Sequence, residues 1–168
     1  SEDGATLLII HVPYQIQILD DDALPYQTIP LGIVLFGQSV ITICGAQTPV
    51  TTAFLEQIRR VCPPKEQFRF TFRLLWHSAV LFLRYLHDIH LRTEAIEQDL
   101  HQSISNVALL RLLTIEKSLV YFTTSLKADN ILIDRVGKAR LLTISEDDRD
   151  VLDDAAVEYL QALETATI

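Results

Sequence analysis

The sequence predicts an α+β chain: a small β-rich part, then two long helices forming an antiparallel hairpin, then a further helix. Three observations support this fold class. Short runs rich in branched apolar residues, bounded by Gly, Pro or Asp, are confined to the first 44 residues. No Gly or Pro interrupts residues 66–103, where apolar residues recur at helical spacing. Residues 106–136 form a second segment of the same kind.

Residues 1–62 are predicted to be the C-terminal part of an α/β subdomain. Pro30 should break the second strand or place it at a sheet edge, because Pro cannot donate to a central ladder. Gly37-Gln38 predicts a hairpin turn, and Thr48-Pro49 predicts the start of a helix that runs to about Val61. The predicted strands are Leu7–Val12, Tyr26–Phe36 and Ser39–Cys44.

Residues 63–140 are predicted to be the long helical hairpin, separated from the first part by Pro63-Pro64. The two helices should join at about residues 103–106, and Gly137 should end the second one as its C-cap. Residues 141–168 are predicted to start a further helix. Ser145 is its expected N-cap, followed by three acidic residues placed where the helix dipole favours them.

Composition narrows the class of function. The 168-residue chain has a formal net charge of −8 at pH 7, which argues against a nucleic-acid or anionic-membrane partner. Residues 59–144 hold 13 Lys or Arg against eight Asp or Glu, whereas residues 145–168 hold eight acids against one Arg. The basic middle and the acidic end can attract each other within or between subunits. Cys44 and Cys62 are too few for a disulfide scaffold and favour a reducing compartment.

The stretch from Phe68 to Leu91 is apolar enough to raise the question of a membrane span, but three arginines interrupt it. Its longest uncharged run, Leu74–Leu83, is about half of the roughly 20 residues that a span needs. We expect a helix buried on most faces, partly against other chains. Because the chain opens without Met and closes inside a helical pattern, we also expect a piece of a longer protein.

The sequence carries no pattern typical of a catalytic site. Its five glycines build neither a phosphate-binding loop nor a nucleophile elbow. Ser118 and Ser125 fall among apolar residues in the middle of a predicted helix, where packing is the expected role. Cys44 and Cys62 lack the spacing of a zinc or redox motif. We therefore predict no catalytic residue.

One helix face combines histidines with acids. His90, Glu94, Glu97 and His101 recur at helical spacing, with His87 nearby, and such a face can bind a transition metal. A di-metal site in a helical bundle also needs Glu-x-x-His on two helices, and the second long helix has no such pair. We interpret these residues as a solvated face near the hairpin tip.

The densest acidic cluster opens the last predicted helix. Apolar residues repeat there at alternating spacings of four and three, which predicts a packing seam that Asp153 flanks and from which Asp150 points away. Outward carboxylates on an oligomerising helix suit Mg²⁺, which is held by one or two carboxylates and keeps several waters. The alternative is an acidic turn that only stabilises the helix dipole. The predicted seam is Leu152, Ala156, Tyr159, Leu163 and Ala166, and the acids are Asp147, Asp148, Asp150, Asp153, Asp154 and Glu158.

Several segments resemble the CorA-type divalent-cation transporters. Leu112–Lys127 resembles the second long cytoplasmic helix of bacterial members, and Arg69–Ile89 resembles the first. Thr28–Leu35 and Val40–Cys44 resemble late strands of the family's cytoplasmic domain. Arg149–Asp153 resembles the start of the stalk helix that leads to the membrane. The likeness covers nearly the whole chain in the right order.

The resemblance implies the tail of a mixed α/β/α sandwich, then the helical hairpin and the start of the stalk helix. It places this piece at the cytoplasmic face of the cell membrane, without the pore signature and both spans. In the family, five subunits surround the pore, and Mg²⁺ bound between neighbouring cytoplasmic domains holds it closed, a population shift by a ligand. We therefore expect a homo-oligomer, a pentamer, that binds Mg²⁺, with Co²⁺ or Zn²⁺ as alternative ions.

The resemblance also implies the metal ligands. The stalk acid that helps to bind the sensing Mg²⁺ matches Asp150, and Asp153 lies one turn further. The acids with which it shares the ion come from an earlier part of the family's domain, before residue 1. A further family acid falls near His77 to Leu81, where this sequence has no carboxylate.

These observations together predict the cytoplasmic metal-sensing domain of a CorA-type Mg²⁺/Co²⁺ transporter, and not an enzyme. The nearest alternative is a zinc-transporting relative with the same fold. Another is a helical oligomerisation module that pairs through residues 68–91 and binds no metal. A metal-dependent enzyme that uses His90 or Glu94 is a more distant alternative.

Overall fold

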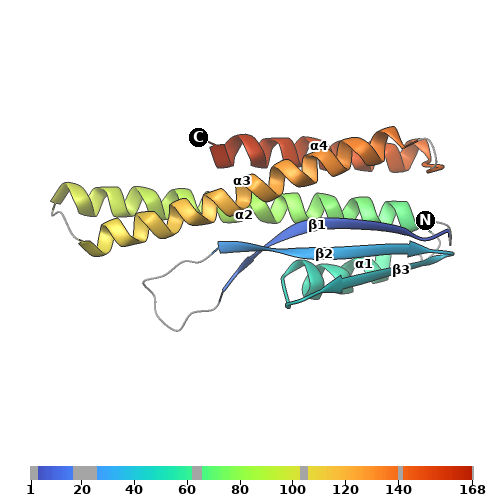
Figure 1. The fold of residues 1–168 in the computed structure, drawn as a ribbon, viewed down its shortest axis with the longest axis horizontal. Helices are drawn as coiled ribbons and strands as arrows, with labels where there is room; N and C mark the ends of the chain where they lie inside the picture. The colour runs from blue at the N-terminus through green and yellow to red at the C-terminus, as the bar shows by residue number, and fades with distance from the viewer. Residues whose placement is uncertain (1–3, 17–25, 62–65, 103–105, 140–141, 168) are drawn as a thin grey trace.

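The computed structural model describes residues 4–16, 26–61, 66–102, 106–139 and 142–167. A three-stranded sheet lies against a set of long helices, with a short helix beside it (Figure 1). The α+β fold class is therefore confirmed. The elements are β1 (Thr6–Gln15), β2 (Tyr26–Phe36), β3 (Ser39–Cys44), a π-helical turn (Val50–Phe54), α1 (Leu55–Val61), α2 (Gln67–Gln102), α3 (Asn106–Lys138) and α4 (Glu146–Thr167).

The sheet is antiparallel, with the order β1-β2-β3. All three predicted strands are present, but β2 is the central strand and Pro30 does not break it. Pro30 pairs with His11 on β1, while the β3 ladder begins one residue later, where Leu31 pairs with Cys44. Pro is tolerated because no β3 residue lies opposite it, so its missing N–H removes no ladder bond.

The hairpin between β2 and β3 is as tight as the sequence predicts. Phe36 pairs with Ser39, which leaves a two-residue loop. Gly37 has a φ of 59°, in the left-handed region where a side chain is strained, and short hairpin loops need such a residue.

The first helical segment follows Thr48-Pro49, as predicted. The Thr48 hydroxyl accepts a hydrogen bond of 3.1 Å from the Thr51 backbone amide, which satisfies one of the free donors at the helix start. The first turn is π-helical and continues into α1.

Helix α2 has 36 residues and α3 has 33, and they run antiparallel (Figure 1). Helix α4 has 22 residues, returns from the end of α3 and packs along both α2 and α3. Gly137 does not end α3: the helix continues to Lys138, and Gly137 keeps a right-handed backbone. A Cβ there would lie 3.8 Å from the Leu152 side chain, so Gly137 lies where α4 approaches α3.

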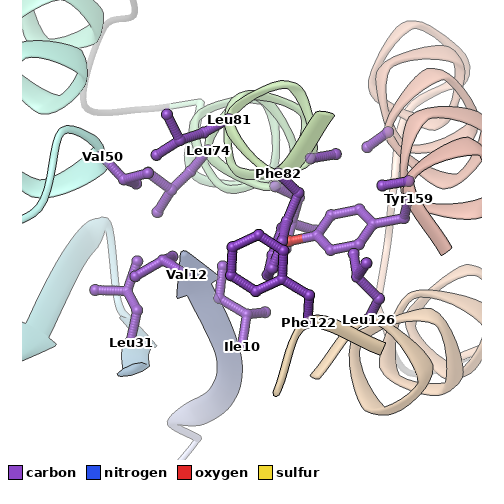
Figure 2. Close-up of a cluster of buried hydrophobic side chains, with 14 of the residues drawn as sticks. Ile10, Val12, Leu31, Val50, Leu74, Leu81, Phe82, Phe122, Leu126 and Tyr159 are labelled. Atoms are coloured by element: carbon purple, nitrogen blue, oxygen red, sulfur yellow. The ribbon is translucent and has the colours of Figure 1, made fainter. Parts of the chain in front are cut away.

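The core is one continuous cluster between one face of the sheet and the helices. Phe82 of α2 and Phe122 of α3 meet edge to face with ring centroids 5.0 Å apart, a favoured aromatic geometry. Tyr159 reaches from α4 toward these two rings (Figure 2). Side chains that converge there from sheet, π-turn and helices include Ile10, Val12, Leu31, Val50, Leu74, Leu81 and Leu126 (Figure 2).

The other face of the sheet is apolar and exposed. Leu7 and Ile9 on β1 and Ile41 and Ile43 on β3 are each more than half exposed. They form two rows across the sheet, because Val34 pairs with both Leu7 and Ile41, and the next row aligns Ile9 with Ile43. The alternation of side chains along each strand thus places apolar residues on both faces.

Helix α2 contains the apolar stretch that raised the question of a membrane span. Phe72, Leu75, Ala79, Phe82 and Leu86 are buried inside the chain, so much of its apolar surface packs intramolecularly, as predicted. Within the described ranges, no helix is both long and apolar enough to cross a membrane.

Candidate metal site

The acidic turn that opens α4 begins at Ser145, the predicted N-cap. Its hydroxyl accepts a hydrogen bond of 3.2 Å from the Asp148 amide, and its carbonyl accepts one of 2.9 Å from the Arg149 amide. Glu146, Asp147 and Asp148 form the first turn, where carboxylates interact favourably with the positive end of the helix dipole.

Arg69 of α2 engages two of these carboxylates. Its Nε lies 3.0 Å from Asp148 Oδ1, and its guanidinium also lies 3.7 Å from Asp147 and 3.3 Å from Glu66. The hydrogen bond to Asp148, with the nearby charge of Glu66, raises the pKa of Arg69 further. Asp147 and Asp148 therefore hold the start of α4 against the start of α2. The attraction between the basic middle and the acidic end acts here within one chain.

Asp150 and Asp153 are the two acids predicted as metal ligands. Both are exposed, and neither side chain forms a hydrogen bond or ion pair with another described residue. Residues three apart lie on the same side of a helix, so the two carboxylates are neighbours on α4. They have the chemistry of ligands for a hard cation, with no basic side chain competing for them.

Asp153 also borders a shallow groove of about 380 Å³ between α3 and α4. Basic groups flank this groove: Lys138 forms an ion pair of 2.7 Å with Asp134, and Arg149 donates a 3.0 Å hydrogen bond to the Gly137 carbonyl. These contacts turn the basic side chains toward α3, which leaves Asp153 unpaired.

The chain by itself does not enclose a cation. Among the residues that the structure describes, no three His, Cys, Asp or Glu side chains group as a metal site. Two carboxylates on an exposed helix face can supply only part of the coordination of Mg²⁺, and water or another chain must supply the rest.

A pocket of about 460 Å³ lies on the side of α4 that carries Asp154. Phe54 and His77 stack in its wall with ring centroids 3.9 Å apart, and Trp76 is 38% exposed beside them. Burial, with the nearby charge of Arg84, lowers the pKa of His77, so its imidazole is neutral at pH 7. The family resemblance predicts an acid near His77 to Leu81, where this sequence has no carboxylate. His77 instead forms part of the aromatic wall of the pocket.

Comparisons with known proteins identify the family. The family model described as CorA-like Mg²⁺ transporter protein matches residues 1–168. This chain belongs to the CorA-like Mg²⁺ transporter family. No sequence among the curated proteins matches this CorA-like chain significantly.

Solved structures show the same fold. The soluble domain of CorA from Methanocaldococcus jannaschii matches with a TM-score of 0.82 and 19% identity, over 99% of this chain and 66% of that one. The complete CorA magnesium transporter from that organism matches with a TM-score of 0.80 and 19% identity, over 99% of this chain and 51% of that one. The CorA-like chain thus spans about two thirds of the soluble domain and half of the complete protein.

A more distant structural match is the ZntB cytoplasmic domain from Vibrio parahaemolyticus RIMD 2210633. Its TM-score is 0.64 and its identity 10%, over 99% of this chain and 67% of that one. It shares the fold of the CorA-like chain.

The packing seam of α4 differs in part from the prediction. Leu152, Tyr159 and Ala166 are buried as their spacing predicts, but the positions between them are filled by Ala155 and Ala162. The predicted members Ala156 and Leu163 are only partly buried. The seam of the CorA-like chain keeps the alternating spacings of three and four residues, but in the other phase, and it packs on α2 and α3 of the same chain.

The histidine face of α2 is exposed, as predicted. His90 Nε2 lies 3.4 Å from Glu94 Oε1, and His87 and Glu97 are also exposed. The side chain of His101 lies outside the described part of the structure. Nothing among the described residues brings a third ligand to this face.

Sequence reasoning missed one polar contact in the CorA-like chain. Asp129 of α3 is 1% exposed and binds His11 of β1. A sequence signal existed: Asp129 lies in the apolar stripe of α3, three residues after Leu126 and four before Ile133, both buried. An acid at a core position needs a partner, but the partner is 118 residues away in the sequence.

Proposed function

We propose that this chain is the cytoplasmic metal-sensing part of a CorA-type Mg²⁺/Co²⁺ transporter and not an enzyme. Asp150 and Asp153 contribute carboxylates to an Mg²⁺ bound between subunits, and the bound ion favours the closed channel. Membership of the CorA-like family supports the link to ion transport. The chain works at the cytoplasmic face of the membrane in a homo-oligomer, for which the family resemblance predicts a pentamer.

The observation that carries the proposal is the contrast within the acidic cluster. Asp147 and Asp148 are engaged by Arg69, whereas Asp150 and Asp153 are exposed and have no basic partner among the described residues. Two like charges close together repel each other, and a divalent cation offsets that repulsion. Without the ion, the acidic faces of neighbouring subunits repel and separate.

The ligand chemistry favours Mg²⁺ over Zn²⁺. Zinc sites use Cys and His as well as carboxylates, whereas Mg²⁺ takes oxygen ligands. Among the described residues, Cys44 lies on β3, away from α4, and no histidine joins Asp150 and Asp153 in a group of three ligands. The zinc-transporting alternative therefore lacks a soft ligand at this site.

Thermal unfolding with and without millimolar Mg²⁺ tests the proposal in the wild type, Asp150→Ala and Asp153→Ala. At 100 times its Kd, a ligand adds about 2.7 kcal/mol to the free energy of unfolding. For a chain of this size, we expect the melting temperature to rise by about 5–10 °C. The rise should be smaller or absent in both variants, and sedimentation should show larger oligomers in Mg²⁺ than in EDTA.

The control is Asp99→Ala, which removes an exposed acid on α2 and should keep the full Mg²⁺ response. An equal response in wild type, Asp150→Ala and Asp153→Ala would exclude these residues as ligands. No response in any protein, with an oligomer that is indifferent to Mg²⁺, would favour the helical oligomerisation module. A response to micromolar Zn²⁺ alone would favour the zinc-transporting relative.

A further inference from the structure

His11 of β1 and Asp129 of α3 form a buried polar contact between the sheet and the helical hairpin. The His11 backbone amide donates to both carboxylate oxygens of Asp129, at 3.1 and 3.0 Å. The His11 Nδ1 atom lies 3.0 Å from Asp129 Oδ1. The Asp129 side chain is 1% exposed and the His11 side chain 34% exposed, so protons can reach the histidine from solvent.

The contact gives a hydrogen-bond acceptor to a backbone amide at the edge of the sheet. β1 is an edge strand, and an amide that points away from β2 has no partner in the ladder. The Asp129 carboxylate accepts from this amide, and nearby Thr28 of β2 and Ser125 of α3 share a hydrogen bond of 2.7 Å. Helix α3 is therefore joined to the sheet by polar bonds as well as by apolar packing.

The charge of this contact depends on His11. One backbone amide and one imidazole are the donors that the described residues direct at Asp129, so only a protonated His11 neutralises an ionised carboxylate there. The other titratable group that interacts with Asp129 is the Tyr159 phenol of α4, which stays neutral. On the α2 side, Asp88 and Arg92 bind each other, and Asp88 accepts from Tyr26 of β2.

The direction of the pH effect follows from the environment. The hydrogen bond to Asp129 raises the pKa of His11 above its usual 6.5, more than burial lowers it. The stabilisation by the pair is thus fully present below pH 6.5 and is lost as the pH rises through the higher value of the folded protein. Burial also raises the pKa of Asp129, and this adds a loss of stability of the same sign as the pH rises from about 4.

We propose that His11 and Asp129 form a proton-operated clamp between the sheet and α3. With His11 protonated, the neutral pair holds α3 against the edge of β1. When His11 loses its proton, a buried negative charge remains and this edge opens more often. The clamp does not involve Asp150 or Asp153, so it can hold or fail independently of the proposed metal site.

The first experiment uses the wild-type chain and NMR. The carbon-bound ring protons of His11 are followed from pH 5 to pH 9. We expect the pKa of His11 to lie above the 6.5 of an ordinary histidine. We also expect the hydrogen-exchange protection of the His11 amide, corrected for intrinsic exchange, to fall roughly fivefold across that titration. The amide of Ile33, in the centre of the sheet, should keep its protection.

Two variants complete the test. From pH 6 to pH 8.5, the melting temperature of the wild type should fall about 2 °C more than that of His11→Gln. The matched control, His87→Gln, should behave as the wild type does. The proposal is overturned if the pKa of His11 does not lie above 6.5, or if the protection of its amide stays constant across the pH range. It is also overturned if His11→Gln retains the full pH dependence of the wild type.

Discussion

At the scale of single residues, two buried tyrosines show how the surroundings of a hydroxyl decide whether it stabilises or destabilises the fold. Tyr26 is 2% exposed and donates a hydrogen bond to Asp88. Tyr159 is fully buried, and neither its hydroxyl nor the neighbouring hydroxyl of Ser78 forms a hydrogen bond of normal length with a described residue. Burial raises the pKa of Tyr159 strongly, the charge of Asp129 raises it further, and the Ser78 hydroxyl lowers it by less. Tyr159 thus contributes its ring to the core, while we expect its poorly bonded hydroxyl to lower stability.

Replacing Tyr159 and Tyr26 by phenylalanine, one at a time, should change the free energy of unfolding in opposite directions. A buried polar group without a partner costs about 1–3 kcal/mol, so we expect Tyr159→Phe to raise the free energy of unfolding by about 1 kcal/mol. Tyr26→Phe removes a bond to a charged partner and should lower it by about 1–2 kcal/mol. Urea unfolding measures both changes. A loss of stability in Tyr159→Phe as large as that in Tyr26→Phe would show that the Tyr159 hydroxyl has a partner after all.

At the scale of elements, the start of α4 depends on local signals and on one distant residue. Ser145 caps the helix, and the acids that follow interact with its dipole. Arg69, 79 residues earlier than Asp148, then fixes this turn against α2. The cap was readable in the sequence, because N-cap chemistry is local. The partner of the acidic turn was not, because it follows from how α2 and α4 pack.

The cap can be tested by itself. Ser145→Ala removes the acceptor for the Asp148 amide, and we expect the free energy of unfolding to fall by about 1 kcal/mol. Ser145→Asn keeps a side-chain acceptor, so its free energy of unfolding should fall by only a few tenths of a kcal/mol. Denaturant unfolding gives the free energies, and amide exchange in the first turn of α4 locates the change. Equal stability of the Ala and Asn variants would argue against a stabilising cap.

At the scale of the whole molecule, α4 docks on α2 and α3 through small side chains. Ala155 and Ala162 are fully buried, and Ala166 is nearly so. Small residues allow helix axes to approach closely, and α4 has its most extensive contacts with α2. The acidic face of α4 points outward, so the position of this helix decides where Asp150 and Asp153 are presented.

Enlarging a residue on each side of α4 separates docking from helix formation. Ala162→Leu inserts a larger side chain into the buried seam and should lower the free energy of unfolding by about 1–3 kcal/mol. Val157→Leu adds one carbon on the outer face, where Val157 is 64% exposed, and should have little effect on the free energy of unfolding. Amide exchange should show faster opening of α4 in Ala162→Leu alone. Equal effects of the two changes would contradict this docking surface.

The sequence by itself determined the class of fold and the existence of each described strand and helix. Period-two and period-3.6 patterns, prolines and caps act within a few residues, so they are readable without a partner. The family resemblance also rested on short segments of sequence, so it could be recognised without knowledge of the tertiary contacts. The match of the family model over residues 1–168 confirms that resemblance.

Only the tertiary structure decided the rest. It showed that Pro30 is harmless because β3 ends before it, and that Gly137 lies within α3, where Leu152 of α4 approaches, instead of ending the helix. It showed that Ala155 and Ala162 are buried in the seam in place of the predicted Ala156 and Leu163, and that Asp129 contacts His11. These features depend on contacts between residues far apart in the chain. A sequence pattern can show that a residue, such as an acid in an apolar stripe, is unusual at its position. Tertiary packing decides which distant residue becomes its partner.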